Sequence, residues 1–152
     1  MEEPLVKIHY WLYPVSWIYG MGVYLRNKLF DWGYYQSKSF DVPVLCVGNL
    51  AVGGTGKTPH TEYLIKLLQQ TGANVAMLSR GYKRKSKGYV LATEKTDVKR
   101  IGDEPYQIKI KFPGIRVAVD ENRCHGIEQL MKLDNPKVDV VLLDDAYQHR
   151  QV

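Results

Sequence analysis

PVLCVGNLAVGGTGKTP, residues 43–59, joins an apolar run to a glycine-rich turn and then to a predicted helix. The run over 42–48 is nearly all apolar, which is typical of a parallel strand covered on both faces. Leucines at near-helical spacing predict a helix over 57–70, where Pro59 is tolerated in the first turn. A glycine-rich turn between a strand and a helix is the context of a phosphate-binding loop, or P-loop.

The glycine-rich turn has the chemistry to hold phosphate groups. Glycines let the backbone point several N–H groups at an anion, and the helix N-terminus adds the positive end of its dipole. A lysine and a threonine at the helix start supply a cation for the terminal phosphates and a hydroxyl for Mg²⁺. Ala51 replaces the usual first glycine, which restricts only the start of the loop. We predict that ATP with Mg²⁺ is bound by Gly53, Gly54, Thr55, Gly56, Lys57 and Thr58. The alternative is a glycine-rich turn with an incidental lysine.

The rest of the chain alternates between predicted strands and helices. Strands are expected at 74–79, 115–119 and 138–145, with helices beginning near Asp103 and covering 122–133. This rhythm favours an α/β fold with a doubly wound, mostly parallel sheet of the P-loop NTPase kind over residues 41–152. The basic stretch over 81–90 is predicted to be a loop or hairpin.

The strand predicted at 138–145 ends in two acids. A carboxylate at the carboxyl end of a strand can hold Mg²⁺ directly or through water, so Asp144 and Asp145 are predicted metal ligands. Gln148 and His149 follow closely and are candidates for positioning substrate or the waters of the metal. The alternatives are a capping or solvent-facing role for the acids and an ordinary surface position for the histidine.

The first forty residues differ from the others because they contain all three tryptophans and few acids. The apolar run over 11–30 is interrupted by Pro14, Gly20 and Gly22 and is flanked by basic residues. Aromatic rings beside cationic groups suit the interface of a lipid bilayer. We therefore expect residues 1–40 to form a helical segment that associates with a membrane surface. The alternative is an N-terminal helical pair packed on its own domain. A cleaved signal peptide fits the pattern less well.

Composition says more about the cellular compartment of the protein than about its function. The formal net charge of +5 suits a protein that meets phosphates or anionic lipids as well as one that meets nucleic acid. Cys46 and Cys124 are far apart and form no CxxC pair, so we expect a reducing compartment and two thiols in the core. No apolar run is long enough to predict a membrane-spanning helix.

Several local motifs occur in one order and together resemble the tetraacyldisaccharide 4′-kinase family, the lipid A 4′-kinases. They are PVLCVGNLAVGGTGKTP at 43–59, LSRGY at 78–82, GDEP at 102–105, NR at 122–123 and DDAYQHR at 144–150. The family commonly has glycine and phenylalanine after the two acids, where this chain has Ala146 and Tyr147. Family members are about twice as long, with a second α/β domain. The resemblance therefore implies that the chain is the N-terminal part of such an enzyme.

The resemblance implies transfer of the γ-phosphoryl group of ATP to the 4′-hydroxyl of tetraacyldisaccharide 1-phosphate, which forms lipid IVA. It makes Asp103 the expected catalytic base, although this aspartate could instead cap the helix that follows. The resemblance also suggests that Lys57, Asp145 and His149 take part in catalysis. The expected contacts with the substrate come from Arg80, Arg123 and Gln148. The alternatives for the two arginines are a contact with the nucleotide and an ordinary surface position.

The implied partners are an acylated disaccharide lipid and a membrane surface, without nucleic acid. The implied place is the cytoplasmic face of the bacterial inner membrane, as a peripheral protein. The basic run over 83–87 could face anionic lipid or be a solvated loop. Two other functions stay open. The first is a soluble P-loop kinase or ATPase with a small acceptor, and the second is a nucleotide-binding or membrane-binding module without catalysis.

Overall fold

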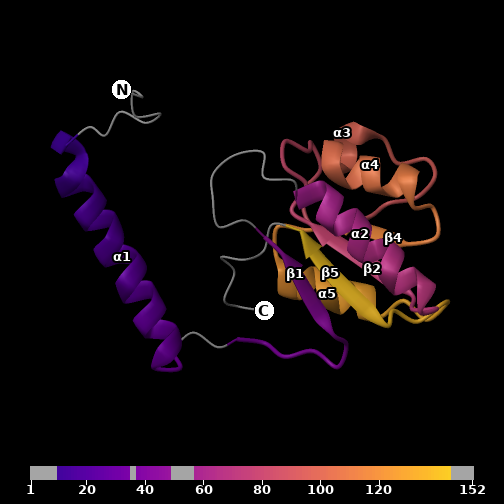
Figure 1. The fold of residues 1–152 in the computed structure, drawn as a ribbon, viewed down its shortest axis with the longest axis horizontal. Helices are drawn as coiled ribbons and strands as arrows, with labels where there is room; N and C mark the ends of the chain where they lie inside the picture. The colour runs from indigo at the N-terminus through magenta and orange to yellow at the C-terminus, as the bar shows by residue number, and fades with distance from the viewer. Residues whose placement is uncertain (1–9, 35–36, 49–56, 145–152) are drawn as a thin grey trace, which may run out of the picture. The chain divides into compact units, whose positions relative to one another are not determined.

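The computed structural model describes residues 10–34, 37–48 and 57–144 (Figure 1). The chain divides into two compact units, Met1–Ser37 and Lys38–Val152. Lys38 belongs with the second unit, where its ammonium group pairs with Glu128. This pair also holds the pKa of the Glu128 carboxyl below its usual value, because the ammonium group donates a hydrogen bond to the carboxylate and attracts its charge.

The first unit contains one long helix. A short 3-10 turn, Tyr10–Leu12, leads into α1, Tyr13–Asp31. The glycines interrupt the apolar pattern but not the helix, and the proline lies in the first turn, where its missing N–H group costs nothing. None of the residues of α1 is buried. In the described parts of the chain, no helix combines the length and apolarity needed to cross a bilayer.

The second unit is built on a five-stranded sheet, which confirms the predicted α/β fold. Its strands are β1 (Val44–Val47), β2 (Val75–Ser79), β3 (Val90–Leu91), β4 (Arg116–Val119) and β5 (Val140–Asp144). Their order across the sheet is β1-β5-β2-β4-β3. All neighbours are parallel except β3, which runs antiparallel to β4. The last strand in the sequence therefore lies between the first two.

Helices cover both faces of this sheet (Figure 1). The helices are α2 (Lys57–Gln70), α3 (Val98–Ile101), α4 (Asp103–Lys111) and α5 (Arg123–Met131). Alternate residues of β2 point to opposite faces, so Met77 packs with Ile65 of α2 and Ile108 of α4. On the other face Leu78 packs with Ile127 of α5. The two clusters make this a three-layer α/β arrangement.

Gly126 lets α5 approach the sheet closely. A Cβ atom on this glycine would lie 2.7 Å from a methyl carbon of Leu78 and 3.1 Å from Cβ of Asp120. Leu78 is fully buried, so its side chain has little room to move away. The glycine therefore fixes the first turn of α5 against the ends of β2 and β4.

Two expectations about burial were wrong. β1 lies at the edge of the sheet, and Leu45 and Cys46 are exposed, so this strand is not covered on both faces. Cys46 is therefore not a core thiol, and Cys124 is only partly buried. The apolar composition of β1 resembles that of β2 and β5, which are buried along their whole length. Composition identified the strand but not its position in the sheet.

Candidate functional site

The carboxyl ends of the parallel strands meet at one edge of the sheet. In the register of β1 and β5, Val47 lies directly opposite Asp144. The chain leaves β1 toward the glycine-rich turn at this point, and Asp144 is the last residue of β5. Ser79 and Val119, at the ends of β2 and β4, are also paired in register. The edge therefore brings together the described ends of β1, β2, β4 and β5, among them Asp144.

The predicted nucleotide site is described only at its borders. Helix α2 begins at Lys57, and Thr58 in its first turn is partly buried. Gly53, Gly54, Thr55 and Gly56 lie outside the described residues, as does the side chain of Lys57. Asp145, Gln148 and His149 also lie outside them. Their roles remain predictions.

Asp144 is buried, with 6% of its surface exposed, and it has interactions with the surrounding protein. A buried carboxylate needs such partners or a cation nearby. In the described part of the chain, no cluster of three or more acidic, histidine or cysteine side chains could hold a metal by itself. A site with only one or two protein ligands would still suit Mg²⁺, which usually keeps several waters and binds phosphate oxygens of the substrate. Asp144 with the Thr58 hydroxyl would be such a site.

Backbone contacts bring the segments of Arg80 and Asp103 together. Gly81 follows Arg80 and has φ of +71°, and a Cβ atom there would lie 2.8 Å from the carbonyl oxygen of Ile101. Gly102 precedes Asp103 and has φ of +91°, and a Cβ atom there would lie 2.9 Å from the carbonyl oxygen of Tyr82. Both positions require glycine for conformation and for space. The two glycines hold the LSRGY and GDEP motifs in contact.

Asp103 is not the cap of α4. The N-cap position belongs to Gly102, and no side chain makes a capping hydrogen bond there. Asp103 is the first residue of the helix and is exposed to solvent. Its carboxylate lies in the first turn, where the helix dipole favours negative charge. Capping of α4 therefore does not explain why an aspartate is found at position 103.

Arg123 is the first residue of α5 and is buried, with 5% of its surface exposed. Cys46 is exposed on β1, but partial desolvation by its neighbours raises the pKa of its thiol, and the positive charge of Arg123 acts against this rise. Asn122 caps α5 by accepting a hydrogen bond from the backbone N–H of His125 at 3.2 Å. Sequence reasoning selected Arg123 but did not predict its burial.

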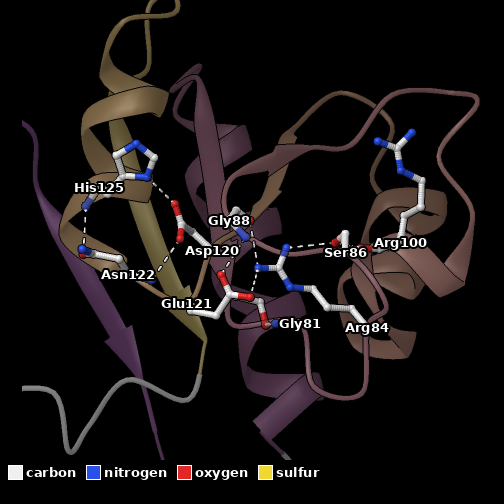
Figure 2. Close-up of polar contacts among 10 residues, drawn as sticks. Gly81, Arg84, Ser86, Gly88, Arg100, Asp120, Glu121, Asn122 and His125 are labelled. Carbon is white, nitrogen blue, oxygen red and sulfur yellow. Dashed lines mark hydrogen bonds and ion pairs between the residues drawn. The ribbon is translucent and has the colours of Figure 1, made fainter.

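A buried aspartate and a histidine lie together at the end of β4 (Figure 2). Asp120 is 2% exposed, and its Oδ2 lies 2.6 Å from Nδ1 of His125. Its Oδ1 accepts a hydrogen bond from the backbone N–H of Asn122 at 2.9 Å. Gln129 contacts the other ring nitrogen of His125 at 3.2 Å. Asp120 therefore attaches the first turn of α5, with Arg123, to the end of β4.

An ion pair between Arg84 and Glu121 anchors the basic segment that follows β2 (Figure 2). The side chain of Arg84 is 3% exposed, and its guanidinium lies 2.7 Å from Glu121. Glu121 also accepts a hydrogen bond from the backbone N–H of Gly88 at 2.9 Å. Burial opposes ionisation of this carboxyl, but hydrogen bonds from its own and the Gly88 backbone and the charge of Arg84 hold its pKa below the usual value.

The comparison with protein families then identifies the chain. The sequence model described as "LpxK: Tetraacyldisaccharide-1-P 4'-kinase" matches residues 8–152. The chain belongs to this family. The predicted family resemblance is confirmed over nearly the whole sequence.

Relatives of the 4′-kinase family match along the whole chain. A tetraacyldisaccharide 4′-kinase of Bacteroides fragilis (strain YCH46) is 69% identical over 152 residues, covering 100% of this chain and 40% of the relative. One from Porphyromonas gingivalis (strain W83) is 52% identical, covering 100% and 42%. A crystal structure of LpxK from Aquifex aeolicus in complex with ATP has a TM-score of 0.80 and 42% identity, covering 92% of this chain and 44% of that one. The chain thus spans about two-fifths of the length of these relatives.

Sequence reasoning missed three polar groups of this member of the family: Asp120, Glu121 and the inward-facing Arg84. Asp120 had a detectable signal, because it ends an apolar strand as Asp144 does. Arg84 had none, since it stands among four other basic residues between Arg80 and Gly88. Its burial depends on Glu121, which is distant in the sequence.

The Arg84–Glu121 pair predicts a specific pH dependence of stability. Folding lowers the pKa of Glu121, so its contribution is complete above the ordinary value of 4.5 and is lost as the pH falls below it. Glu121→Gln should lower the free energy of unfolding by about 1 kcal/mol at neutral pH, since nearly half of this side chain is exposed. Urea denaturation should show the difference from the wild type shrinking below pH 4.5.

Glu94→Gln is the matched control, because Glu94 is also exposed but lies outside this network. Its effect should be small at every pH. A gap between wild type and Glu121→Gln that stays constant as the pH falls would contradict the ion pair.

Proposed function

We propose that this chain is the nucleotide-binding, membrane-facing part of an ATP-dependent kinase. The kinase phosphorylates the 4′-hydroxyl of tetraacyldisaccharide 1-phosphate and forms lipid IVA in lipid A synthesis. The observation that carries the proposal is the parallel pairing of β1 with β5. Through this pairing, the strand that leads into the P-loop and the strand that carries Asp144 end side by side at one edge of the sheet. Family membership and the likeness to LpxK in complex with ATP support the same assignment.

Phosphoryl transfer depends on positioning and charge neutralisation more than on covalent chemistry by the protein. In this proposal the P-loop amides and Lys57 bind the phosphate oxygens. Thr58, Asp144 and Asp145 would hold Mg²⁺, which would supply charge neutralisation at the phosphates. Gln148 and His149 follow the acidic pair and act from the same sheet edge.

Asp103 is the proposed base. Its carboxylate accepts the proton of the sugar 4′-hydroxyl while the hydroxyl oxygen bonds to the γ-phosphorus and ADP leaves. Asp103 makes no capping hydrogen bond at the start of α4 and is exposed, so its carboxylate is accessible to a substrate. Arg80 and Arg123 are the proposed contacts for anionic groups of the substrate or nucleotide, and the contact between the LSRGY and GDEP motifs supports a shared site for Arg80 and Asp103.

The proposed location is the cytoplasmic face of the bacterial inner membrane, with residues 1–37 resting on the bilayer. The tryptophans described in this unit are all strongly exposed, with Trp11, Trp17 and Trp32 at 74%, 79% and 72%. Indole rings favour the head-group region, where their apolar body and N–H group are both accommodated. A surface helix would bring the enzyme to a substrate whose acyl chains remain in the membrane.

Substitution of Lys57 tests the kinase assignment. Lys57→Ala should abolish nearly all transfer of labelled γ-phosphate from ATP to the disaccharide lipid in detergent micelles, because the terminal phosphates lose their cation. Lys66→Ala, an exposed lysine of the same helix, should retain activity. Both variants are assayed in this chain and in the full-length protein that contains it. Unchanged transfer by full-length Lys57→Ala would remove the P-loop from the mechanism.

Flotation with neutral phosphatidylcholine vesicles tests the membrane assignment. Replacing Trp11, Trp17 and Trp32 together by alanine should lower vesicle binding by more than about tenfold, because the apolar area transferred to lipid is lost. Tyr63→Ala is the control, since Tyr63 is 65% exposed on α2 of the other unit. Equal binding by the wild type and the triple variant would contradict membrane docking through residues 1–37.

A further inference from the structure

The segment from Gly81 to Gly88, here called the basic loop, follows the carboxyl end of β2. Its side chains alternate between two environments. Lys83, Lys85 and Lys87 are exposed, whereas Arg84 and Ser86 are partly buried. The loop is not a regular strand, so this alternation comes from specific contacts of the inward-facing residues. Every outward position between 83 and 87 is a lysine.

The inward-facing residues attach the loop to its surroundings (Figure 2). One guanidinium nitrogen of Arg84 donates to the Gly88 carbonyl at 2.8 Å, and the other terminal nitrogen donates to the Ser86 hydroxyl at 3.2 Å. The Ser86 hydroxyl donates in turn to the Arg100 carbonyl. Together with the Glu121 ion pair, these contacts leave the Arg84 charge engaged within the protein.

Backbone contacts hold the loop as well. The N–H of Lys85 donates to the Lys99 carbonyl at 2.8 Å. Lys83 has φ of +59°, a conformation that a residue with a side chain adopts only where the surrounding structure enforces it. Its ammonium group lies 5.2 Å from the ring centroid of Tyr82, which is 75% exposed. The loop therefore presents its lysines and this tyrosine from a fixed backbone.

The three outward ammonium groups have no carboxylate partner among the residues that the structure describes. Their charges are thus available to an external anion. Exposed lysines beside an exposed tyrosine suit an extended surface of negative charge at the level of lipid head groups.

We propose that the basic loop binds the surface of an anionic lipid bilayer through Lys83, Lys85 and Lys87. This inference rests on the proposed function for its biological setting, since the substrate lies in a membrane. The loop follows β2 at the sheet edge where the candidate site is located. Contact with the bilayer there turns this edge toward the lipid that carries the substrate.

Vesicle binding measured at two lipid compositions tests this proposal on the full chain. The readout is the ratio of binding to vesicles of phosphatidylglycerol with phosphatidylcholine over binding to phosphatidylcholine alone. Lys83, Lys85 and Lys87 are replaced together by glutamine. The ratio should fall by more than about tenfold, because each basic residue at an anionic surface contributes separately. Binding to the neutral vesicles should stay unchanged.

Two further variants make the result specific. Replacing Lys66, Lys132 and Lys137 by glutamine removes the same number of charges from exposed positions outside the loop and should change the ratio little. Replacing the three loop lysines by arginine keeps the charges and should preserve the ratio. Equal falls in both glutamine variants would assign the effect to net charge and overturn the proposal.

Other outcomes separate this proposal from the kinase assignment. An unchanged ratio in the loop variant overturns the proposal, while phosphate transfer in detergent micelles still reports on the kinase. If Lys57→Ala loses kinase activity while the loop variant keeps the wild-type ratio of vesicle binding, the kinase assignment is supported and lipid binding by the basic loop is overturned. Loss of binding to duplex DNA without loss of the lipid ratio would assign the loop to nucleic acid and overturn lipid binding.

Discussion

The parallel pairing of β1 with β5 is the constraint on which the candidate site depends. It sets the end of the strand that precedes the P-loop beside the end of the strand that carries Asp144. A triphosphate with its magnesium ion requires amide donors, a cation and carboxylate oxygens within a few ångströms. Two neighbouring parallel strands bring such groups together although they are far apart in the sequence, because both of their carboxyl ends face the same edge. The apolar side chains of β5 and β2 hold that edge in place from within the core.

Around this edge, close approaches at three glycines position the segments that carry the candidate site residues. Gly81 and Gly102 bring two motifs together at distances that a Cβ atom would prevent, and Gly126 does the same for α5 and the sheet. Asp120 then fixes the start of α5, and the Arg84–Glu121 pair fixes the basic loop. Chemistry that depends on alignment benefits from such a rigid surround, since small displacements of reacting groups reduce the rate strongly. The exposed lysines of the basic loop thus remain accessible to ligands, whereas the charges of Arg84 and Glu121 pair with each other.

Local sequence patterns predicted the types of the main elements because those depend on neighbouring residues. The helix over 57–70 was predicted with the boundaries that the structure has, and the α/β fold is confirmed. Strand order was not predictable in this way, since the insertion of β5 between β1 and β2 is a long-range choice. For the same reason the exposure of β1, the short helix α3 and the inward turn of Arg84 were missed. In the candidate site, motifs identified the groups, but burial of Arg123 and the Asp120–His125 contact required the folded chain.

The central claim is that the start of α2 and the end of β5 hold one magnesium-bound nucleotide. A double-mutant cycle on the affinity for Mg-ATP tests it most directly, using Thr58→Val, Asp144→Asn and the double variant. If both residues act through one ion, their effects are coupled by roughly 0.5–3 kcal/mol, and the coupling disappears when ATP is bound without Mg²⁺. Losses that add independently, or coupling that persists without the ion, would contradict a shared site.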